Sequence, residues 1–539
     1  MKKIVSPILG VLLAVSLMLT GCGSQSTTSP SAPQAEKTLI EGRGGDSVSL
    51  DPANVTDGES LRVTENIFDT LVAYKPNNTE IIPSLATEWK ASPDGKEWTF
   101  TLQDGVKFHD GTDFNADAVV FNFQRWMDKS NPYHTGGDFD YFQSMFGGFK
   151  GDKGCVIADV KALDKTHVQF RLTVPQAPFL ANVAMTAFAM ASPDAVKKYG
   201  DKFGQNPVGT GPFVFKEWKP NDSITVVKNK NFWQKGLPKL DKLIFRVIPD
   251  NTARLTALQS GELDLMDGLN PSDAATVKGN SKLQLVTRPS MNVGYLSFNT
   301  TKPPFDNVKV RQALSMAVNK KGLVDAFYNG MALPAKNALP PSVWGYNDAV
   351  KDYEYNLDAA KKLLAEAGYP NGFETDFWAM PVARQYMPQP QKIAESIQAD
   401  FAKIGVKTKI VSMEWATYLK KTKNGEHPMA LLGWTGDNGD PDNFLYVLLD
   451  KDNANPPAAS NISLYKNDKV HELLFKAQIT PDIQVRTDLY KQAQLLIHDD
   501  APMVPLVHST PLLASASYVK GFIAHPTGTE RFTEVSIEK

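Results

Sequence analysis

The sequence predicts an α/β protein built from more than one lobe. The chain has 539 residues, which is too long for one compact hydrophobic core. Residues 98–102 alternate apolar and polar side chains, as a half-buried strand does. Residues 391–404 carry apolar side chains at helical spacing, Gly405 ends that helix, and residues 406–411 follow as a strand. Because this alternation of helix and strand is typical of α/β domains, we expect two or three such lobes.

Capping residues place further elements. Asn115 stands where the N-cap of a helix over 116–128 belongs, and Asn356 does the same for a helix over 357–367 that Gly368 ends.

Nearer the N-terminus the pattern is less regular. Short strands and turns follow Thr38, and residues 59–63 open a helix that we expect to carry Ile67, Phe68 and Leu71.

Two turn-rich motifs favour a structural role over a chemical one. His109 precedes Asp110 and Gly111 in a predicted hairpin, where a histidine is more often structural than catalytic. Residues 209–211 (Gly-Thr-Gly) lack the Lys and the spacing of a phosphate-binding loop. We expect them to form a tight turn before a strand at 213–215.

The composition is that of a globular protein without a strong charge excess. Hydrophobic residues make up 42% of the chain and charged residues 22%. The 57 Lys and Arg stand against 59 Asp and Glu, so we expect no nucleic acid as a partner.

The first residues predict an export signal. Lys2 and Lys3 precede a mostly apolar run over 4–19, and the sequence Leu-Thr-Gly-Cys at 19–22 resembles a bacterial lipobox. The resemblance implies cleavage after a signal peptide of residues 1–21 and attachment of lipid to Cys22. Residues 22–36 are rich in Ser, Thr, Pro and Gly, as a flexible tether is. A membrane-spanning helix is the alternative, which the Ser, Pro and Gly residues within the apolar run disfavour.

The predicted signal peptide and lipidation at Cys22 determine what we expect of the cysteines and of the cellular location. The chain has two cysteines, and lipid on Cys22 would leave Cys155 as a spare thiol beside the loop at 151–154, without an intrachain disulfide. We expect an exported protein, lipid-anchored to the outer face of the cell membrane or held in the periplasm.

The stretch 432–444 is a candidate binding loop. It holds three Gly, one Pro and three Asp in thirteen positions, between Trp434 and Phe444. Because Gly and Pro interrupt regular structure and Asp and Asn favour turns, we expect no helix or regular strand there. A loop with aromatic walls and the carboxylate of Asp437 is suited to hold a small cation such as an amine. An ordinary acidic surface turn is the alternative.

A second candidate lies at 377–388, where Arg384 stands among aromatic residues, Met and Pro. The arginine side chain presents a rigid fork of donors that matches a carboxylate. Alternatively, Arg384 satisfies backbone carbonyls of its own lobe.

Several longer runs of the chain resemble one family, the family 5 solute-binding proteins, which are the peptide and nickel receptors of bacterial ABC importers. The resemblance extends from about residue 38 to the end. Its blocks are Leu-Ala-Thr-Glu-Trp at 85–89, Gly-Val-Lys-Phe-His-Asp-Gly at 105–111, Asn-Pro-Val-Gly-Thr-Gly-Pro-Phe at 206–213, and Asn299 with Pro-Pro-Phe-Asp-Asn-Val-Lys-Val-Arg-Gln-Ala at 303–313.

The resemblance implies a two-lobed periplasmic-binding-protein-like fold of type II, of the large cluster C type. Lobe I would cover 37–289, with an extra subdomain over about 62–205, and lobe II would cover 290–507. Residues 508–539 would return to lobe I. It further implies a substrate-binding protein rather than an enzyme, a monomer that delivers its ligand to the permease and ATPase subunits of an importer.

The block at 433–444 is similar to that of the dipeptide receptors within this family. The resemblance implies that Asp437 holds the peptide ammonium group and Arg384 its carboxylate, so that two fixed charges measure a dipeptide of about 7 Å. Neighbouring residues would flank the ligand from lobe II (Trp434, Thr435 and Tyr386) and close over it from lobe I (Glu59, Ser60, Tyr133 and His134).

The sequence disfavours several other ligands and chemistries. A calcium loop formed by Asp437, Asp440 and Asp442 fails the EF-hand spacing, and we expect the last two to shape the loop by capping its turns. The sequence shows no hydrolase motif and no His cluster with metal-ligand spacing, so we expect no cofactor and no metal. Longer oligopeptides, glutathione and haem stay open as ligands of the same kind of receptor.

Overall fold

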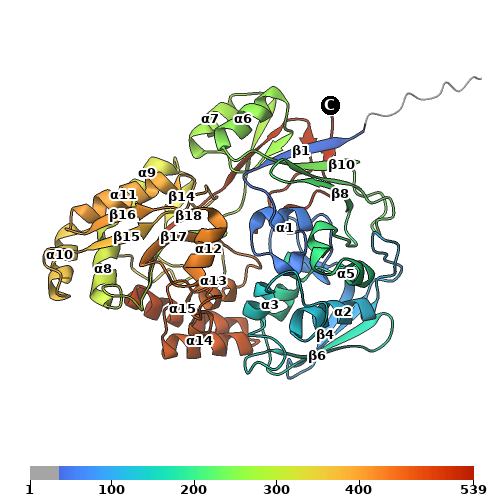
Figure 1. Ribbon diagram of the computed structural model, residues 1–539, viewed down its shortest axis with the longest axis horizontal. Helices are drawn as coiled ribbons and strands as arrows, with labels where there is room; N and C mark the ends of the chain where they lie inside the picture. The colour runs from blue at the N-terminus through green and yellow to red at the C-terminus, as the bar shows by residue number, and fades with distance from the viewer. Residues whose placement is uncertain (1–35) are drawn as a thin grey trace, which may run out of the picture. The chain divides into compact units, whose positions relative to one another are not determined.

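Lobe I is built on a seven-stranded mixed sheet (Figure 1). In the sheet, β1 pairs in parallel with β10 and β11, and the other pairs are antiparallel. Because β19 lies between β12 and β11, a C-terminal strand completes the sheet that the N-terminal strand β1 begins. The strands in spatial order are β12 (Leu283–Thr287), β19 (Leu512–Ala516), β11 (Leu265–Met266), β1 (Thr38–Arg43), β10 (Lys242–Val247), β9 (Ser223–Lys228) and β8 (Phe213–Lys219).

The computed structural model describes residues 36–539. The predicted signal peptide, the lipid-bearing Cys22 and all but the last residue of the tether 22–36 lie outside the described residues.

Lobe II contains a six-stranded sheet. Strands β13 and β17 pair along their whole length, from Asn292 opposite Thr435 to Phe298 opposite Met429. The boundary predicted at 507 falls within β18. The strands in spatial order are β14 (Ala332–Pro334), β18 (Met503–Ser509), β13 (Asn292–Phe298), β17 (Met429–Thr435), β15 (Glu374–Trp378) and β16 (Lys407–Val411).

A four-stranded antiparallel sheet lies within lobe I and forms its extra subdomain. The strands in spatial order are β4 (Ala86–Ala91), β5 (Glu97–Leu102), β7 (His167–Leu172) and β6 (Ile157–Ala162). Helix α2 (Ala116–Met127) packs against β6 and β7, and Phe123 and Phe170 meet edge to face between them. The predicted strand and helix are confirmed here, and Asn115 caps α2 by accepting a hydrogen bond from the Ala118 amide.

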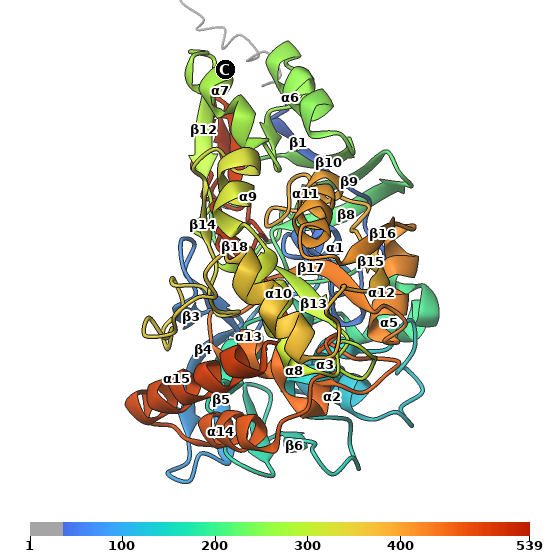
Figure 2. The same cartoon turned by 90° about the vertical axis from the view of Figure 1, so that its left-hand side faces the viewer.

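Helices cover the sheets of both lobes. Helices α8 and α10 pack together on the outer side of lobe II, which faces the viewer in Figure 2. Among the described residues, no helix combines the length and the apolar character needed to cross a membrane. Besides α2, the α-helices of lobe I are α1 (Gly58–Thr64), α3 (Asp140–Met145), α4 (Phe179–Val183), α5 (Pro193–Tyr199), α6 (Asn251–Ser260) and α7 (Ala274–Lys278). Those of lobe II are α8 (Val308–Ala317), α9 (Lys320–Phe327), α10 (Leu357–Glu366), α11 (Pro390–Ala402), α12 (Trp415–Lys423), α13 (Asp442–Leu449), α14 (Asp468–Ile479) and α15 (Ile483–Asp500). There are also two small two-stranded antiparallel sheets, β2 (Val72–Tyr74) with β3 (Ile81–Pro83) and β20 (Val519–Lys520) with β21 (Ser536–Ile537).

The helix predicted from residue 59 is shorter than expected. Helix α1 ends at Thr64, and the apolar residues that follow it are buried in irregular chain. The backbone there bonds to another segment: the carbonyl of Asn66 accepts from the Phe213 amide and that of Ile67 from the Gly211 amide. A Cβ at position 211 would stand 2.6 Å from the Ile67 carbonyl carbon. The glycine at 211 is therefore needed for this close approach, and the Gly-Thr-Gly turn is structural.

The prediction that 432–444 holds no helix or strand is wrong at both ends. Strand β17 extends to Thr435, because Trp434 and Thr435 pair across the sheet with β13. Helix α13 begins at Asp442, directly after Pro441. Only residues 436–441 form a loop, and it connects the carboxyl end of β17 to α13.

Candidate ligand-binding site

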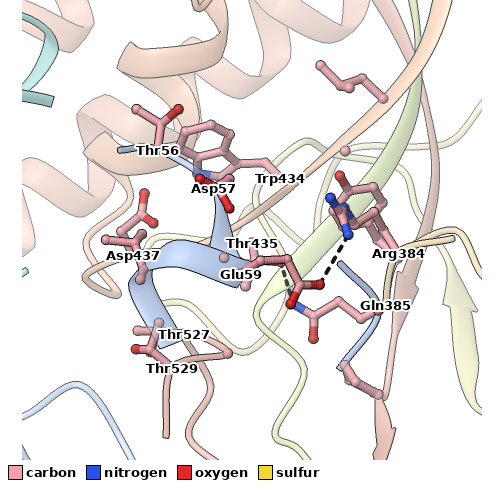
Figure 3. Close-up of a pocket in the computed structure, with 18 of the residues that line it drawn as sticks. Thr56, Asp57, Glu59, Arg384, Gln385, Trp434, Thr435, Asp437, Thr527 and Thr529 are labelled. Carbon is pink, nitrogen blue, oxygen red and sulfur yellow. Dashed lines mark hydrogen bonds and ion pairs between the residues drawn. The ribbon is translucent and has the colours of Figure 1, made fainter. Parts of the chain in front are cut away.

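A cavity of about 290 Å³ lies between the two lobes. Lobe I contributes the start of α1, the start of α3 and the chain after β11, whereas lobe II contributes the end of β17 and the segments before α11 and in α12. Figure 3 shows the polar residues of its wall. Charged groups on the wall include Asp57, Glu59, Arg62, Asp267, Arg384 and Asp437.

The Asp437 carboxylate is held by hydrogen bonds from neutral side chains. Its Oδ1 accepts a hydrogen bond from the Tyr141 hydroxyl at 2.9 Å, and its Oδ2 accepts one from Asn443 Nδ2 at 3.0 Å. Burial raises the pKa of Asp437 to about 6, although the hydrogen bonds from Asn443 and Tyr141 lower it. Within the part of the chain that the structure describes, no basic side chain pairs with it. A cationic ligand group would supply the missing countercharge.

Asn443 fixes the loop that carries this carboxylate. Its side-chain oxygen accepts from the Asp437 amide at 2.9 Å and from Trp434 Nε1 at 3.0 Å, while its amide nitrogen donates to the carboxylate. The first turn of α13 therefore holds the end of β17, the loop and the Asp437 side chain in one arrangement.

Arg384 lies in the turn between β15 and α11. The turn is closed by two backbone hydrogen bonds between Arg384 and Met387, at 3.0 and 2.8 Å. The guanidinium carbon stands 5.1 Å from the centre of the Trp415 ring. Its nearest carboxylate is that of Glu59, with Nη1 3.5 Å from Oε1. This single long contact leaves other guanidinium donors for a ligand carboxylate.

The other residues predicted on lobe II also line the cavity. A Cβ at position 433 would stand 2.2 Å from the Tyr386 ring, so Gly433 is required for Tyr386 to lie flat on the strand. The Thr435 hydroxyl accepts from Gln385 Nε2 at 2.5 Å, and Gln385 Oε1 accepts from Arg288 of lobe I at 2.8 Å. Gln385, Tyr386, Trp434 and Thr435 all line the cavity.

Of the residues predicted on lobe I, the structure brings only Glu59 to the cavity. Ser60 is buried, and its hydroxyl accepts from the Val48 amide at 2.8 Å. The Tyr133 ring packs 5.5 Å from that of Phe121.

His134 is likewise occupied within its own lobe. It stacks on Phe139 at 4.2 Å, and its Nδ1 lies 2.8 Å from the Arg125 carbonyl oxygen. Ser60, Tyr133 and His134 are therefore fixed by the packing of lobe I and do not line the cavity.

Buried charges support the lobe I wall behind Glu59. Arg62 pairs with Asp267 at 2.7 Å and lies 3.7 Å from both Glu41 and Glu530. Burial raises the pKa of Glu41 to about 8, against the lowering effect of Arg62. Arg288 joins Glu530 at 2.5 Å, so one network extends from the centre of lobe I to Gln385 of lobe II.

Side chains of the two lobes contact each other around the cavity. An ion pair joins Lys423 to Asp140 at 2.7 Å, and Asn438 Nδ2 donates to Asn182 Oδ1 at 2.9 Å. With the contacts of Arg384, Asp437 and Gln385 described above, they hold the lobes together and enclose the cavity.

Sequence reasoning missed several residues of the site. Tyr141 and Asn443 hold the Asp437 carboxylate, but no sequence pattern marked them. Their roles depend on the fold, which brings Tyr141 to Asp437 from 296 residues away in the chain. Gln385 follows Arg384 directly, and this adjacency was the sequence signal that could have indicated its place in the site.

One group of possible metal ligands lies outside the cavity wall. Among residues 36–539, Asp450, Asp452 and His471 bring their ligand atoms within 4.8 Å of one another. His471 Nδ1 lies 3.1 Å from Asp450 Oδ1, so a hydrogen bond accounts for the contact.

The fold and the cavity define a class of protein: a two-lobed solute-binding protein with a cavity lined by charged side chains between its lobes. The sequence pattern of the bacterial extracellular solute-binding proteins, family 5, matches residues 80–456. The chain therefore belongs to this family.

Among its relatives, the dipeptide-binding protein of Escherichia coli (strain K12) is 43% identical, over 93% of this chain and 95% of that protein. Heme-binding protein A of Haemophilus influenzae is 41% identical, over 98% of both chains.

Solved structures agree in fold. The dipeptide-binding protein of Pseudoalteromonas sp. SM9913, in complex with Met-Leu, has a TM-score of 0.88 at 34% identity, covering 93% of this chain and 100% of that one. The periplasmic binding protein DppA of Helicobacter pylori, in complex with the peptide STSA, has a TM-score of 0.87 at 40% identity, covering 93% and 98%.

Proposed function

We propose that this chain is the substrate-binding lipoprotein of an ABC importer and that it binds dipeptides by their charged termini. The observation that carries the proposal is the pair of opposite charges on one lobe, Arg384 and Asp437, both on the wall of the same enclosed cavity. Asp437 would hold the ammonium group and Arg384 the carboxylate, with Trp434, Thr435 and Tyr386 beside the peptide.

The mechanism would be a shift between open and closed states. A ligand that contacts both lobes favours the closed state, and the importer would recognise that state. The lipid on Cys22 would tether the monomeric receptor to the membrane, outside the cytoplasm and beside its permease and ATPase partners. The relatives named for dipeptide binding support the choice of ligand.

Two specific findings favour other ligands. One structural neighbour holds a peptide of four residues, STSA, and one relative is named for haem. A longer peptide has its termini farther apart, so it could engage Arg384 and Asp437 together only by bending. Haem has no ammonium group to pair with Asp437.

Isothermal titration calorimetry can separate these readings. We expect Met-Leu to bind more tightly than N-acetyl-Met-Leu, Met-Leu amide, Ser-Thr-Ser-Ala or haem. Equal affinity for Met-Leu and both blocked forms would refute recognition by the termini, and tighter binding of the tetrapeptide or haem would move the protein to that ligand class. Release of free Met and Leu during the titration, detected by mass spectrometry, would instead identify an enzyme.

Dipeptide affinity should also fall as the pH decreases through about 6. Burial raises the pKa of Asp437 to about 6, and only the ionised form attracts an ammonium group. Between about pH 5 and about pH 7 the peptide keeps both terminal charges, because its amino group has a pKa of about 8 and its carboxyl group one of about 3.5. We therefore expect the Kd of Met-Leu to rise about tenfold from about pH 7 to about pH 5.

The control for this pH effect is Asp437→Asn, whose weak residual binding should not change over the same range. Because the folded-state pKa is raised, protonation of Asp437 stabilises the ligand-free protein at low pH, so unfolding at this residue does not explain the loss. A Kd that stays constant in the wild type would contradict the role of Asp437.

A further inference from the structure

Glu59 lies between two arginines at the end of the cavity that holds Arg384. Its Oε1 is 3.5 Å from Arg384 Nη1, and its Oε2 is 4.0 Å from Arg62 Nη1. The side chain is 12% exposed, and Oε2 is buried without a hydrogen-bond partner. Figure 3 shows the Glu59 carboxylate directed at the Arg384 guanidinium group. The Glu59 carboxylate of lobe I thus pairs with Arg384 of lobe II, the cation that we propose for the ligand carboxylate.

The backbone of Glu59 is fixed in this position. Asp57 caps α1 by accepting a hydrogen bond from the Ser60 amide at 2.9 Å. The Glu59 carbonyl oxygen accepts from Arg43 Nη1 at 2.7 Å and from the Ser47 hydroxyl at 3.2 Å. The backbone of Glu59 is therefore anchored, and its carboxylate can move away from Arg384 only by a change of side-chain rotamer.

We propose that Glu59 is an internal competitor for the peptide carboxylate. This inference rests on the proposed function of the site. A carboxylate that binds Arg384 must replace the contact with Glu59 or share the guanidinium group with it, and two like charges close together in a partly buried site repel each other. Glu59 thereby weakens the grip of the closed receptor on the ligand terminus and favours its release.

Arg62 is a second cation that Glu59 can pair with after the ligand arrives. It contacts Oε2, whereas Arg384 contacts Oε1, and its charge is shared with Asp267, Glu41 and Glu530. Glu59 therefore keeps one cation when the ligand takes the other.

The opposite role, in which Glu59 orients Arg384 for the ligand, predicts the opposite sign. If Glu59 positions Arg384, removal of its charge weakens binding of a peptide with a free carboxylate. If Glu59 competes, removal strengthens it. In either case a peptide whose carboxyl group is blocked as an amide should respond little, because it brings no negative charge to this end.

The test is Glu59→Gln, which keeps the shape and removes the charge, titrated with Met-Leu and with Met-Leu amide. We expect the Kd of Met-Leu to fall about threefold to tenfold and that of the amide to stay within about a factor of two. The preference for the free acid over the amide should therefore increase. A preference that decreases or stays the same would overturn the inference.

Control variants separate the competing explanations. Glu374→Gln removes the same charge from a side chain that is 76% exposed on lobe II and should change neither Kd. Glu59→Asp withdraws the carboxylate by one methylene and should give an intermediate preference, which keeps the test valid if Glu59→Gln folds poorly.

The wild type distinguishes this inference from the proposed function. If the wild-type protein shows no preference for Met-Leu over its amide, the proposed recognition of the peptide carboxylate and the role of Glu59 are both refuted. If it shows the preference and Glu59→Gln does not increase it, only the role of Glu59 is refuted.

Discussion

Replacement of Asp437 by alanine is expected to abolish tight dipeptide binding while the protein still folds. Truncation of one partner of a desolvated, hydrogen-bonded charge pair costs about 2–5 kcal/mol, or about 30-fold to 4,000-fold in Kd. No basic side chain of the described residues pairs with the Asp437 carboxylate. The ligand ammonium group would therefore be its cationic partner. Calorimetry with Met-Leu measures the loss directly.

The fold should tolerate this change, because the native state already desolvates the Asp437 carboxylate at a cost. Burial is the main cause of its raised pKa, so a neutral residue at 437 removes an unfavourable charge. Thermal unfolding without ligand should therefore show little change. The decisive control is N-acetyl-Met-Leu, which lacks the ammonium group: its Kd should be nearly the same for wild type and Asp437→Ala. An unchanged Kd for free Met-Leu would exclude Asp437 as the ammonium site.

Local sequence rules predicted the long, regular elements and failed where distant segments replace local bonds. Asn115 and Asn356 cap helices as expected, because a cap needs only the neighbouring amides. The chain after Thr64 does not continue as a helix, since its carbonyls bond to residues 211 and 213. No local pattern shows that partner.

Some residues of the candidate site could likewise be predicted from the sequence, and others could not. Asp437 and Arg384 stand in recognisable stretches, and the resemblance to a family supplied their roles. The residues that hold the Asp437 carboxylate, Tyr141 and Asn443, act through geometry that only the fold creates. Tyr133 and His134, which we expected to close over the ligand, contact Phe121 and Phe139 within their own lobe, and no local pattern shows those partners.

The loop carrying Asp437 rests on a buried ion pair beneath it. Asp440 accepts from Arg486 Nη2 at 2.7 and 2.9 Å, and its Oδ1 also accepts from the Asp442 amide at 3.0 Å. Asp440 thus caps the turn that starts α13, as predicted from its place in the loop. Asp442 does not: burial raises its pKa to about 8, with Asp440 as a further cause, and its side chain accepts from Gln478.

Arg486→Met is accordingly expected to have the largest effect on stability. The guanidinium group donates to Asp440, to the Tyr490 hydroxyl at 2.9 Å and, through Nε, to the Ala477 carbonyl at 3.0 Å. Methionine keeps much of the aliphatic volume but leaves Asp440 buried and uncompensated beside α13. Such a loss costs about 3–5 kcal/mol, measurable as a lower urea midpoint, and the loosened loop should also weaken Met-Leu binding.

Two further variants show whether the uncompensated charge is the cause. Arg246→Met removes an arginine whose side chain is 41% exposed in its pair with Glu262, and it should cost less than about 1 kcal/mol. Adding Asp440→Asn to Arg486→Met removes the stranded charge but keeps an acceptor for the Asp442 amide, so the double variant should regain part of the lost stability. If it is instead less stable than Arg486→Met alone, then packing of the arginine over Trp344, at 4.9 Å from its ring centre, is the larger contribution. In that case the loop is held by contact rather than by charge.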